Sequence, residues 1–339
     1  MIHRHVTVHI RWFEVMSHLP AMLLAAGLAA APLLARTAAA ADYKRLGEVR
    51  REIVRQPRSE VIVGGGRIDI AFADGAAGLD REQVLSWVQR SAHAVSVYFG
   101  RFPVDRVSIL IIAETGDRVG HATTWGYDGA TIRIGVGREA KSAAFLDDWI
   151  MVHEMTHLAL PGLPDAQQWA LEGNATYVEP IARVQAGHLD AKTVWGDMVR
   201  GMPKGLPRAS DRGLDRTHTW GRTYWGGALF YLLADVEIRQ QTQNRLGLQH
   251  ALRAINRASG GNGAEWTIDR FIEVGDRATG TDVLARIYAR MREEPATVDL
   301  NAFFASLGVT VSGGIVQLDE EARLADIRRA LMEPPAPVP

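Results

Sequence analysis

The sequence predicts an α+β protein, in which a small mixed sheet with flanking helices precedes a lobe built from helices. In residues 42–142, apolar residues alternate with polar ones or form short continuous runs, which is typical of strands. In residues 143–332, apolar residues recur mainly at the three- and four-residue spacing of helices. With 339 residues, the chain is long enough for one large domain or two modest ones.

The β-rich first lobe, 42–142, is expected to mix strands with two helices. The charged residues at its start form either a short helix or a lead-in segment, and three glycines between two apolar runs indicate a hairpin. An apolar stripe that includes Val84, Trp87 and Phe99 predicts a longer helix, and two further apolar runs predict strands. In chain order these elements cover residues 43–57, 60–72, 79–99, 106–113 and 130–136.

The second, helical lobe is expected to begin with a long helix that has Asp147 and Asp148 near its start, where the helix dipole favours acidic residues. Residues 190–218 are rich in Gly, Pro and Arg and predict a long loop, which either rims a cleft or is a solvated connector. In chain order the expected helical segments cover residues 143–160, 167–185, 222–258 and 267–308.

Residues 1–41 have the order of a secretory signal peptide. Arg4 and Arg11 precede an apolar run, and small residues follow up to Ala41. The apolar run is shorter than the ~20 residues that span a bilayer, which favours cleavage over a retained anchor. We therefore expect an exported protein, periplasmic or secreted, with no stable membrane span after cleavage. The Pro-rich residues 333–339 predict a disordered tail.

Composition narrows the class of protein further. The net charge of −1 gives no sign of a nucleic-acid-binding surface. The absence of cysteine excludes disulfide bonds and thiolate metal sites. An exported protein without disulfides fits a bacterial envelope better than a small secreted scaffold.

The most specific motif is H-E-x-x-H, formed by His153, Glu154 and His157 within an apolar helical run. Residues four apart lie one turn apart on the same helix face, so the two imidazoles can bind one zinc ion. Glu154 lies beside that face, where it can take a proton from a metal-bound water. The alternative to a zinc site is that so short a motif occurs here by chance. A third candidate ligand elsewhere in the sequence argues against chance.

Glu172 is the candidate third ligand, because catalytic zinc sites use three protein ligands and leave one position open. It follows a helix stop at residues 161–164, and a second helix after this turn can fold back against the two histidines. The sequence therefore predicts Zn²⁺ as cofactor, held by His153, His157 and Glu172.

These residues resemble the gluzincin metallopeptidases, in particular the aminopeptidase N and glycyl aminopeptidase families. The likeness rests on H-E-x-x-H followed by W-x-x-E-G-x-A-x-Y-x-E, and on a later Y-x-x-G-A segment. It implies that Glu172 is the third zinc ligand, that Thr176 helps to orient a ligand and that Tyr224 stabilises the oxyanion. It also implies a gluzincin-like fold with the zinc between a small sheet lobe and a helical catalytic lobe.

The chain departs from aminopeptidase N relatives in two ways. The gap between the second histidine and the third-ligand glutamate is shorter. The G-x-M-E-N strand, whose glutamate binds the substrate's free amine in that family, is missing, and its nearest counterpart at residues 126–135 lacks the glutamate. These differences favour a peptidase that is not a strict aminopeptidase.

The expected reaction is hydrolysis of a bond in a peptide or protein substrate. Glu154 acts as general base on a zinc-activated water and passes the proton to the leaving amine. The Tyr224 hydroxyl donates to the carbonyl oxygen as negative charge develops there. An extended substrate is expected to pair with the strand that begins at Gly129 and Ala130.

Two alternatives remain open on the sequence. The first is a non-catalytic envelope binding protein on a metallopeptidase scaffold, against which the intact Glu154 and the three ligands argue. The second is a zinc hydrolase of non-peptide amides or epoxides, because the same zinc, water and glutamate serve those reactions. A panel of peptide and amide substrates separates these readings.

Overall fold

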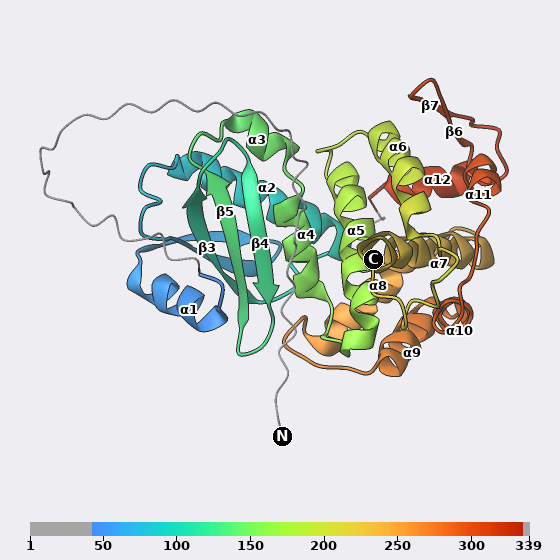
Figure 1. The fold of residues 1–339 in the computed structure, drawn as a ribbon, viewed down its shortest axis with the longest axis horizontal. Coiled ribbons are helices and arrows are strands. Elements are labelled where there is room, and N and C mark those ends of the chain that lie inside the picture. The colour runs from blue at the N-terminus through green and yellow to red at the C-terminus, as the bar shows by residue number, and fades with distance from the viewer. Residues whose placement is uncertain (1–42, 335–339) are drawn as a thin grey trace, which may run out of the picture.

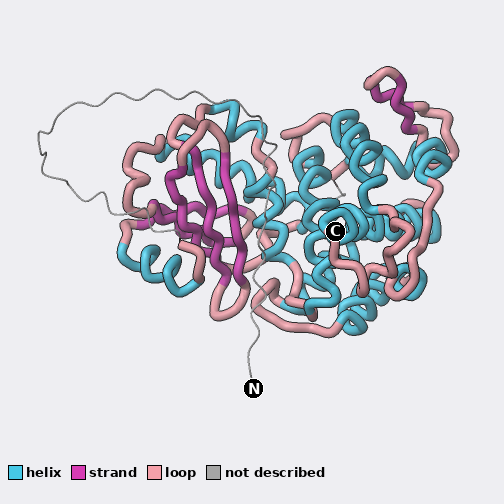
Figure 2. The backbone as a smooth tube through the Cα atoms, viewed as in Figure 1, coloured by secondary structure: helices cyan, strands magenta, loops and turns pink. Residues whose placement is uncertain are grey.

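The structure, a computed structural model, describes residues 43–334 and contains a sheet lobe followed by a helical lobe (Figure 1). Figure 2 shows the strands gathered on one side, apart from a small hairpin at the far edge of the helical part. The expected signal peptide at 1–41 and residues 335–339 of the expected tail lie outside the described residues. Within residues 43–334, no helix is both long and apolar enough to cross a membrane.

The main sheet has five strands in the order β1-β2-β3-β5-β4. The three central strands are parallel, whereas β1 pairs antiparallel with β2, and β4 with β5. The hairpin and the two later strands expected from the sequence are therefore confirmed. The strands are β1 (Arg58–Val63), β2 (Gly66–Phe72), β3 (Arg106–Glu114), β4 (Val119–Trp125) and β5 (Ala130–Gly137).

Successive residues of the central strands point to opposite faces of the sheet and are buried in different cores. Ile109 belongs to the main core, which includes α2 (Arg81–Phe99) and continues into the helical lobe. Leu110 belongs to a smaller core beneath α1 (Leu46–Arg55), together with Trp125. The helix α2 was expected, and α1 decides between the two alternatives for residues 43–57 in favour of a helix. The alternation also explains why apolar residues run continuously through β3.

The position of β5 corrects the expected substrate strand. The strand that follows Gly129 and begins at Ala130 pairs with β3 on one side and β4 on the other, so its backbone groups are already used. The outermost strand on this side is β4, which contacts the helix that carries the H-E-x-x-H motif. Residues 119–125 gave no strand signal because they neither alternate in polarity nor form an apolar run.

The single helix expected at 143–160 is interrupted at Asp148. It is divided into α3 (Ser142–Asp147), α4 (Ile150–Thr156) and a 3₁₀ turn, η1 (His157–Ala159). Asp148 is extended, and its carboxylate accepts hydrogen bonds from the N–H groups of Ile150 and Met151 at 3.0 and 3.1 Å. This carboxylate therefore satisfies free N–H groups at the start of a new helix, which fixes where α4 begins.

The prediction of a long loop at 190–218 is wrong for the first part of this segment. That part forms α6 (Ala191–Gly201) and the 3₁₀ turn η3 (Met202–Gly205). Asp190 caps α6 by accepting a hydrogen bond from the Thr193 N–H at 3.1 Å. Val194, Trp195 and Met198 are buried on one face, so packing stabilises this helix despite the glycines and prolines that follow it.

The remaining helices follow the expected pattern up to residue 308. The short hairpin of β6 (Val309–Ser312) and β7 (Ile315–Leu318), and the final helix α12 (Ala325–Met332), were not expected, because each is too short to give a clear period. The expected helices are α5 (Gln168–Gln185), α7 (Gly227–Gln241), α8 (Leu248–Ser259), α9 (Ile268–Thr279), α10 (Val283–Met291) and α11 (Leu300–Ser306).

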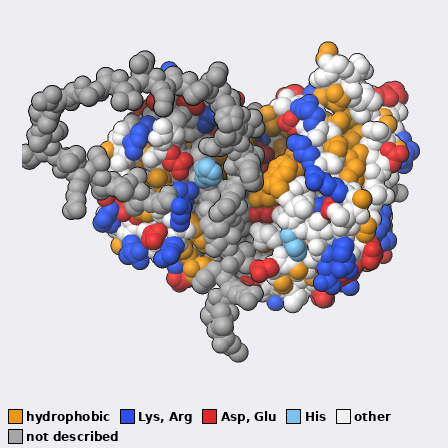
Figure 3. Space-filling view, viewed as in Figure 1, with side chains coloured by type: hydrophobic (Ala, Val, Ile, Leu, Met, Phe, Trp, Pro, Cys, Tyr) orange, Lys and Arg blue, Asp and Glu red, His pale blue; other side chains and the backbone are white. Residues whose placement is uncertain are grey.

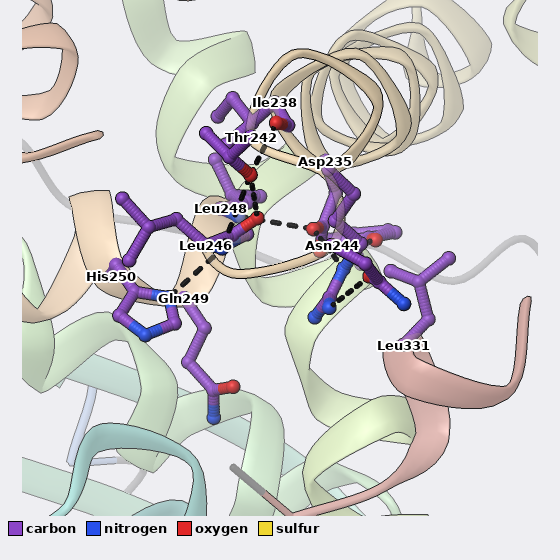
Figure 4. Close-up of polar contacts among 12 residues, drawn as sticks. Asp235, Ile238, Thr242, Asn244, Leu246, Leu248, Gln249, His250 and Leu331 are labelled. Carbon is purple, nitrogen blue, oxygen red and sulfur yellow. Dashed lines mark hydrogen bonds and ion pairs between the residues drawn. The ribbon is translucent and has the colours of Figure 1, made fainter. Parts of the chain in front are cut away.

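The buried carboxylate of Asp235 joins three helices of this lobe, and Figure 4 shows it beside Leu248 at the start of α8. Asp235 of α7 accepts hydrogen bonds from the Tyr177 hydroxyl of α5 at 3.0 Å and from Arg239 Nε at 2.9 Å. It also accepts one from the Leu248 N–H, at the start of α8, at 3.0 Å. Because α5 also carries Glu172, this network helps to hold the candidate ligand in place.

Replacing Asp235 with Ala should lower the free energy of unfolding by about 3 kcal/mol, because it leaves a buried guanidinium and a buried hydroxyl without their partner. Urea denaturation measures the difference. Asp105 is the matched control, since its side chain is 102% exposed and its substitution by Ala should change stability by less than about 0.5 kcal/mol. Equal losses in the two variants would contradict the proposed role of Asp235.

Candidate metal centre

The H-E-x-x-H residues lie on α4 and on the 3₁₀ turn that continues it. His153 and Glu154 belong to α4, and His157 is the first residue of η1. The two imidazole rings are 4.8 Å apart between centroids and nearly perpendicular, at 82°. One turn of helix thus brings two imidazoles to the same point, as the spacing predicted.

Glu172 on α5 completes the group of possible ligands. Its Oε2 lies 3.4 Å from His153 Nε2 and 3.5 Å from His157 Nε2. All three atoms are buried, and none has a hydrogen-bond partner within residues 43–334. Three unpartnered polar atoms that meet at one buried point would be costly without a ligand.

The separation of these atoms fits a zinc ion. Two atoms that each lie ~2.0–2.2 Å from a tetrahedral zinc are about 3.4 Å apart from each other. The chemistry of the donor set, two imidazole nitrogens and one carboxylate oxygen, is also that of catalytic zinc sites. Among the described residues, His153, His157 and Glu172 form a group able to hold a metal ion.

The protonation preferences of the group reflect its crowded charges. Burial by itself would raise the pKa of Glu172, but the neighbouring imidazoles lower it well below its usual range. Burial would likewise lower the pKa of His157, but the Glu172 carboxylate raises it. The carboxylate is therefore ionised and draws positive charge to this point, which a cation can supply.

Glu154 lies beside the ligands with one oxygen held and the other free. Its Oε2 accepts a hydrogen bond of 2.6 Å from the Thr124 hydroxyl on β4, and its Oε1 is buried without a partner. The pKa of Glu154 is raised above its usual value, because the effect of burial exceeds the opposing effect of His157 and His153. Thr124 could not be identified from the sequence, because its contact with Glu154 depends on where β4 lies beside α4.

Tyr224 reaches the same group from a π-helical turn, η4 (Gly221–Gly226), a geometry that recurs at functional sites. Its ring stacks on that of His153, with centroids 6.4 Å apart and an angle of 19°. Burial and the charge of Glu172, with which the hydroxyl interacts, raise the pKa of Tyr224 well above its usual value. The hydroxyl therefore keeps its proton at neutral pH.

The glycine after Glu172 explains how Tyr224 comes so close. A Cβ atom on Gly173 would lie 2.3 Å from the Gly227 Cα, so α5 and the start of α7 touch backbone to backbone. Any larger side chain at either position would push the π-helical turn away from the candidate ligands.

The other residues singled out from the sequence lie elsewhere or contact other groups. The Thr176 hydroxyl donates to the backbone carbonyl of Glu172 at 2.8 Å, so this hydrogen bond joins it to the backbone of a candidate ligand. The Gly129 carbonyl accepts a hydrogen bond from Arg50 of α1 at 2.9 Å, and Ala130 pairs with Val107 of β3. The hydrogen bond of Gly129 thus joins it to α1, and the pairing of Ala130 joins it to β3. Neither is a contact with a candidate ligand.

A cleft of about 410 Å³ opens beside His153 and Tyr224. Aromatic residues form much of its wall, and sequence reasoning did not single them out, because tryptophans spread along a chain give no pattern. The remaining lining residues are Trp149, Thr176, Glu179, Pro180, Asp197, Arg200, Gly201, Lys204, Trp220 and Trp225.

No protein-family model matches the chain, and no curated protein matches it. Among solved structures, it is similar to an aminopeptidase N family protein from Idiomarina loihiensis, with a TM-score of 0.57 and 14% identity over 76% of this chain and 50% of that one. It is also similar to an M1 zinc metallopeptidase from Deinococcus radiodurans, with a TM-score of 0.45 and 13% identity over 71% of this chain and 52% of that one.

The chain spans about half the length of the solved structures that it matches. At 14% identity, the likeness to the aminopeptidase N family protein shows a shared fold. The α+β architecture expected from the sequence, a small sheet lobe joined to a helical lobe, is thereby confirmed.

Proposed function

We propose that this chain is a zinc-dependent peptidase. The observation that carries the proposal is the convergence of three buried, unpartnered ligand atoms, with the Glu172 oxygen 3.4 and 3.5 Å from the two imidazole nitrogens and the free oxygen of Glu154 beside them. The shared fold supports it, since the solved structure from Idiomarina loihiensis is named as an aminopeptidase N family protein. Export belongs to the same proposal and rests on the signal-like order of residues 1–41.

His153, His157 and Glu172 would hold the metal. Zinc in such a site polarises a carbonyl group and lowers the pKa of a water to near neutrality. Thr124 holds one oxygen of Glu154, which leaves the buried, unpartnered Oε1 available to take a proton from a water at the candidate metal site. The same carboxylic acid then donates that proton to the leaving amine.

The substrate is expected to pair with β4, and not with β5 as the sequence suggested. β4 is the outermost strand and contacts α4, so a peptide added to its edge would pass beside the candidate ligands. The protonated Tyr224 hydroxyl would then donate a hydrogen bond to the carbonyl oxygen as it gains charge.

Replacing Tyr224 with Phe should lower kcat about 10²-fold, which is the scale of losing one oxyanion donor. The zinc content should stay the same, because Tyr224 is not among the candidate ligands. Steady-state kinetics on one cleaved peptide, with metal analysis of the same preparation, measure both effects. An unchanged kcat would reduce Tyr224 to a packing residue.

Two measurements on the purified chain test the proposed function. Mass spectrometry should find about one zinc per chain, and incubation with a mixed peptide digest should give new amine termini. Zinc without peptide cleavage would favour the hydrolase of non-peptide amides, which a panel of amide substrates would identify. Absence of zinc after reconstitution would favour the non-catalytic binding protein.

A further inference from the structure

We infer that Lys204 binds a carboxylate of the substrate, so that the cleft selects peptides with a free C-terminus or an acidic side chain. The inference rests on the proposed function, because it concerns the substrate class of the same site. It follows from the walls of the cleft, the pairing of its charges and the composition of the neighbouring edge strand.

The cleft wall holds the Lys204 ammonium over two aromatic rings. Its Nζ lies 5.9 Å from the centroid of Trp220 and 5.6 Å from that of Trp225. A Cβ atom on Gly201 would lie 2.0 Å from the Trp225 ring, so this ring packs directly on the backbone of α6 and is fixed there. The lysine thus lies along the cleft wall, beside one ring that is packed on α6 and one that is half-exposed.

The charges that line the cleft leave Lys204 as the cation without an acidic partner. Asp197 forms an ion pair with Arg200 at 2.6 Å, and Glu179 forms one with Arg183 at 3.0 Å. Within residues 43–334, Lys204 has contacts with aromatic rings but no ion pair with a carboxylate. An anionic group on a ligand can therefore pair with it without displacing an internal partner.

The surroundings of Lys204 suit a ligand that is apolar apart from its anionic group. Trp220 is 48% exposed, a large fraction for an aromatic ring on a cleft wall. Figure 3 shows apolar side chains gathered on the helical side of the boundary between the lobes, with Lys and Arg side chains running beside them. Lys204 itself is exposed, so an anionic group on a ligand can reach its ammonium while the apolar part of the ligand contacts the two rings.

The composition of the edge strand β4 also favours a ligand with an anionic group over one with a free amine. β4, with the sequence VGHATTW, contains no acidic residue that could bind a free amine at the start of a peptide. Residues 126–135, the counterpart of the amine-binding strand expected from the sequence, contain no glutamate, and the edge strand β4 supplies none either. β4 therefore offers no carboxylate to a free amine, while Lys204 on the cleft wall is available to pair with an anion.

Binding can be measured without hydrolysis in the Glu154→Gln protein loaded with zinc. The probes are three acetylated alanine peptides of equal length: one amidated at the C-terminus, one with a free C-terminus, and one amidated with a single central glutamate. Titration calorimetry should give at least about tenfold tighter binding of one carboxylate peptide than of the neutral one, a difference of about 1.4 kcal/mol. The peptide that binds more tightly identifies which carboxylate is recognised.

Variants at Lys204 decide whether this residue causes the preference. Lys204→Met should reduce the ratio to below about twofold, and Lys204→Arg should keep most of it, because the charge remains. Lys192→Met is the matched control, since Lys192 lies exposed on α6 away from the cleft, and it should keep the full ratio. Raising the salt concentration should lower the ratio in the unsubstituted background.

The outcomes separate this inference from the proposed function. A preference that persists in Lys204→Met would place the carboxylate on another group, including the metal, and overturn the inference. Equal binding of the three probes, or binding of none, would overturn it as well. Carboxylate-selective binding by a chain that hydrolyses no peptide would support the Lys204 site and reject the peptidase.

Discussion

Replacing Glu154 with Gln should reduce peptide hydrolysis by about 10²–10⁴-fold, the range for losing a general acid–base group, while zinc stays bound. Glutamine has the size of glutamate and can still accept a hydrogen bond from Thr124, so the surroundings should keep their geometry. It cannot take a proton from water at neutral pH. Initial rates on a single peptide, with the zinc content of the same sample, measure the two effects together.

Glu294→Gln is a suitable control, because Glu294 is exposed and lies outside the cleft. It should retain both the rate and the zinc of the unsubstituted protein. Hydrolysis by Glu154→Gln at the unsubstituted rate would remove Glu154 from the role of general base. Loss of zinc from this variant would instead indicate that Glu154 holds the metal site together.

The candidate ligands were predictable because their spacing is set by local helix geometry. His153 and His157 are one turn apart, so they share a face wherever the helix packs. The position of Glu172 could be predicted from a helix, a helix stop and a second helix that folds back. In the structure its carboxylate lies within 3.5 Å of both imidazoles. Tyr224 was suggested only by a resemblance of short motifs.

The parts that the sequence did not predict depend on contacts between distant segments. Thr124 meets Glu154 because β4 forms the outer edge of the sheet, and its residues show no strand pattern of their own. Tyr224 reaches the ligands through the close approach of Gly173 and Gly227, which no periodicity reveals. The break before α4 likewise depends on the fold, because the Asp148 carboxylate accepts hydrogen bonds from the Ile150 N–H and from the indole of the distant Trp87.

Replacing Glu172 with Ala should abolish stable zinc binding and, with it, peptide hydrolysis. The variant leaves two imidazoles without the carboxylate that completes the donor set, and two histidines are fewer ligands than zinc sites use. Metal analysis after dialysis should find about one zinc per chain in the unsubstituted protein and far less in the variant. Full zinc content in Glu172→Ala would exclude Glu172 as a ligand.

A thermal measurement tests the same assignment without relying on activity. A metal that binds only the folded chain adds about 2.7 kcal/mol of stability at a free concentration of 100 times its Kd. A chelator should therefore lower the Tm of the unsubstituted protein and of the Glu294→Ala control, but leave that of Glu172→Ala nearly unchanged. Equal chelator effects on Glu172→Ala and the control would mean that the stabilising metal binds elsewhere, and that the three unpartnered atoms have another purpose.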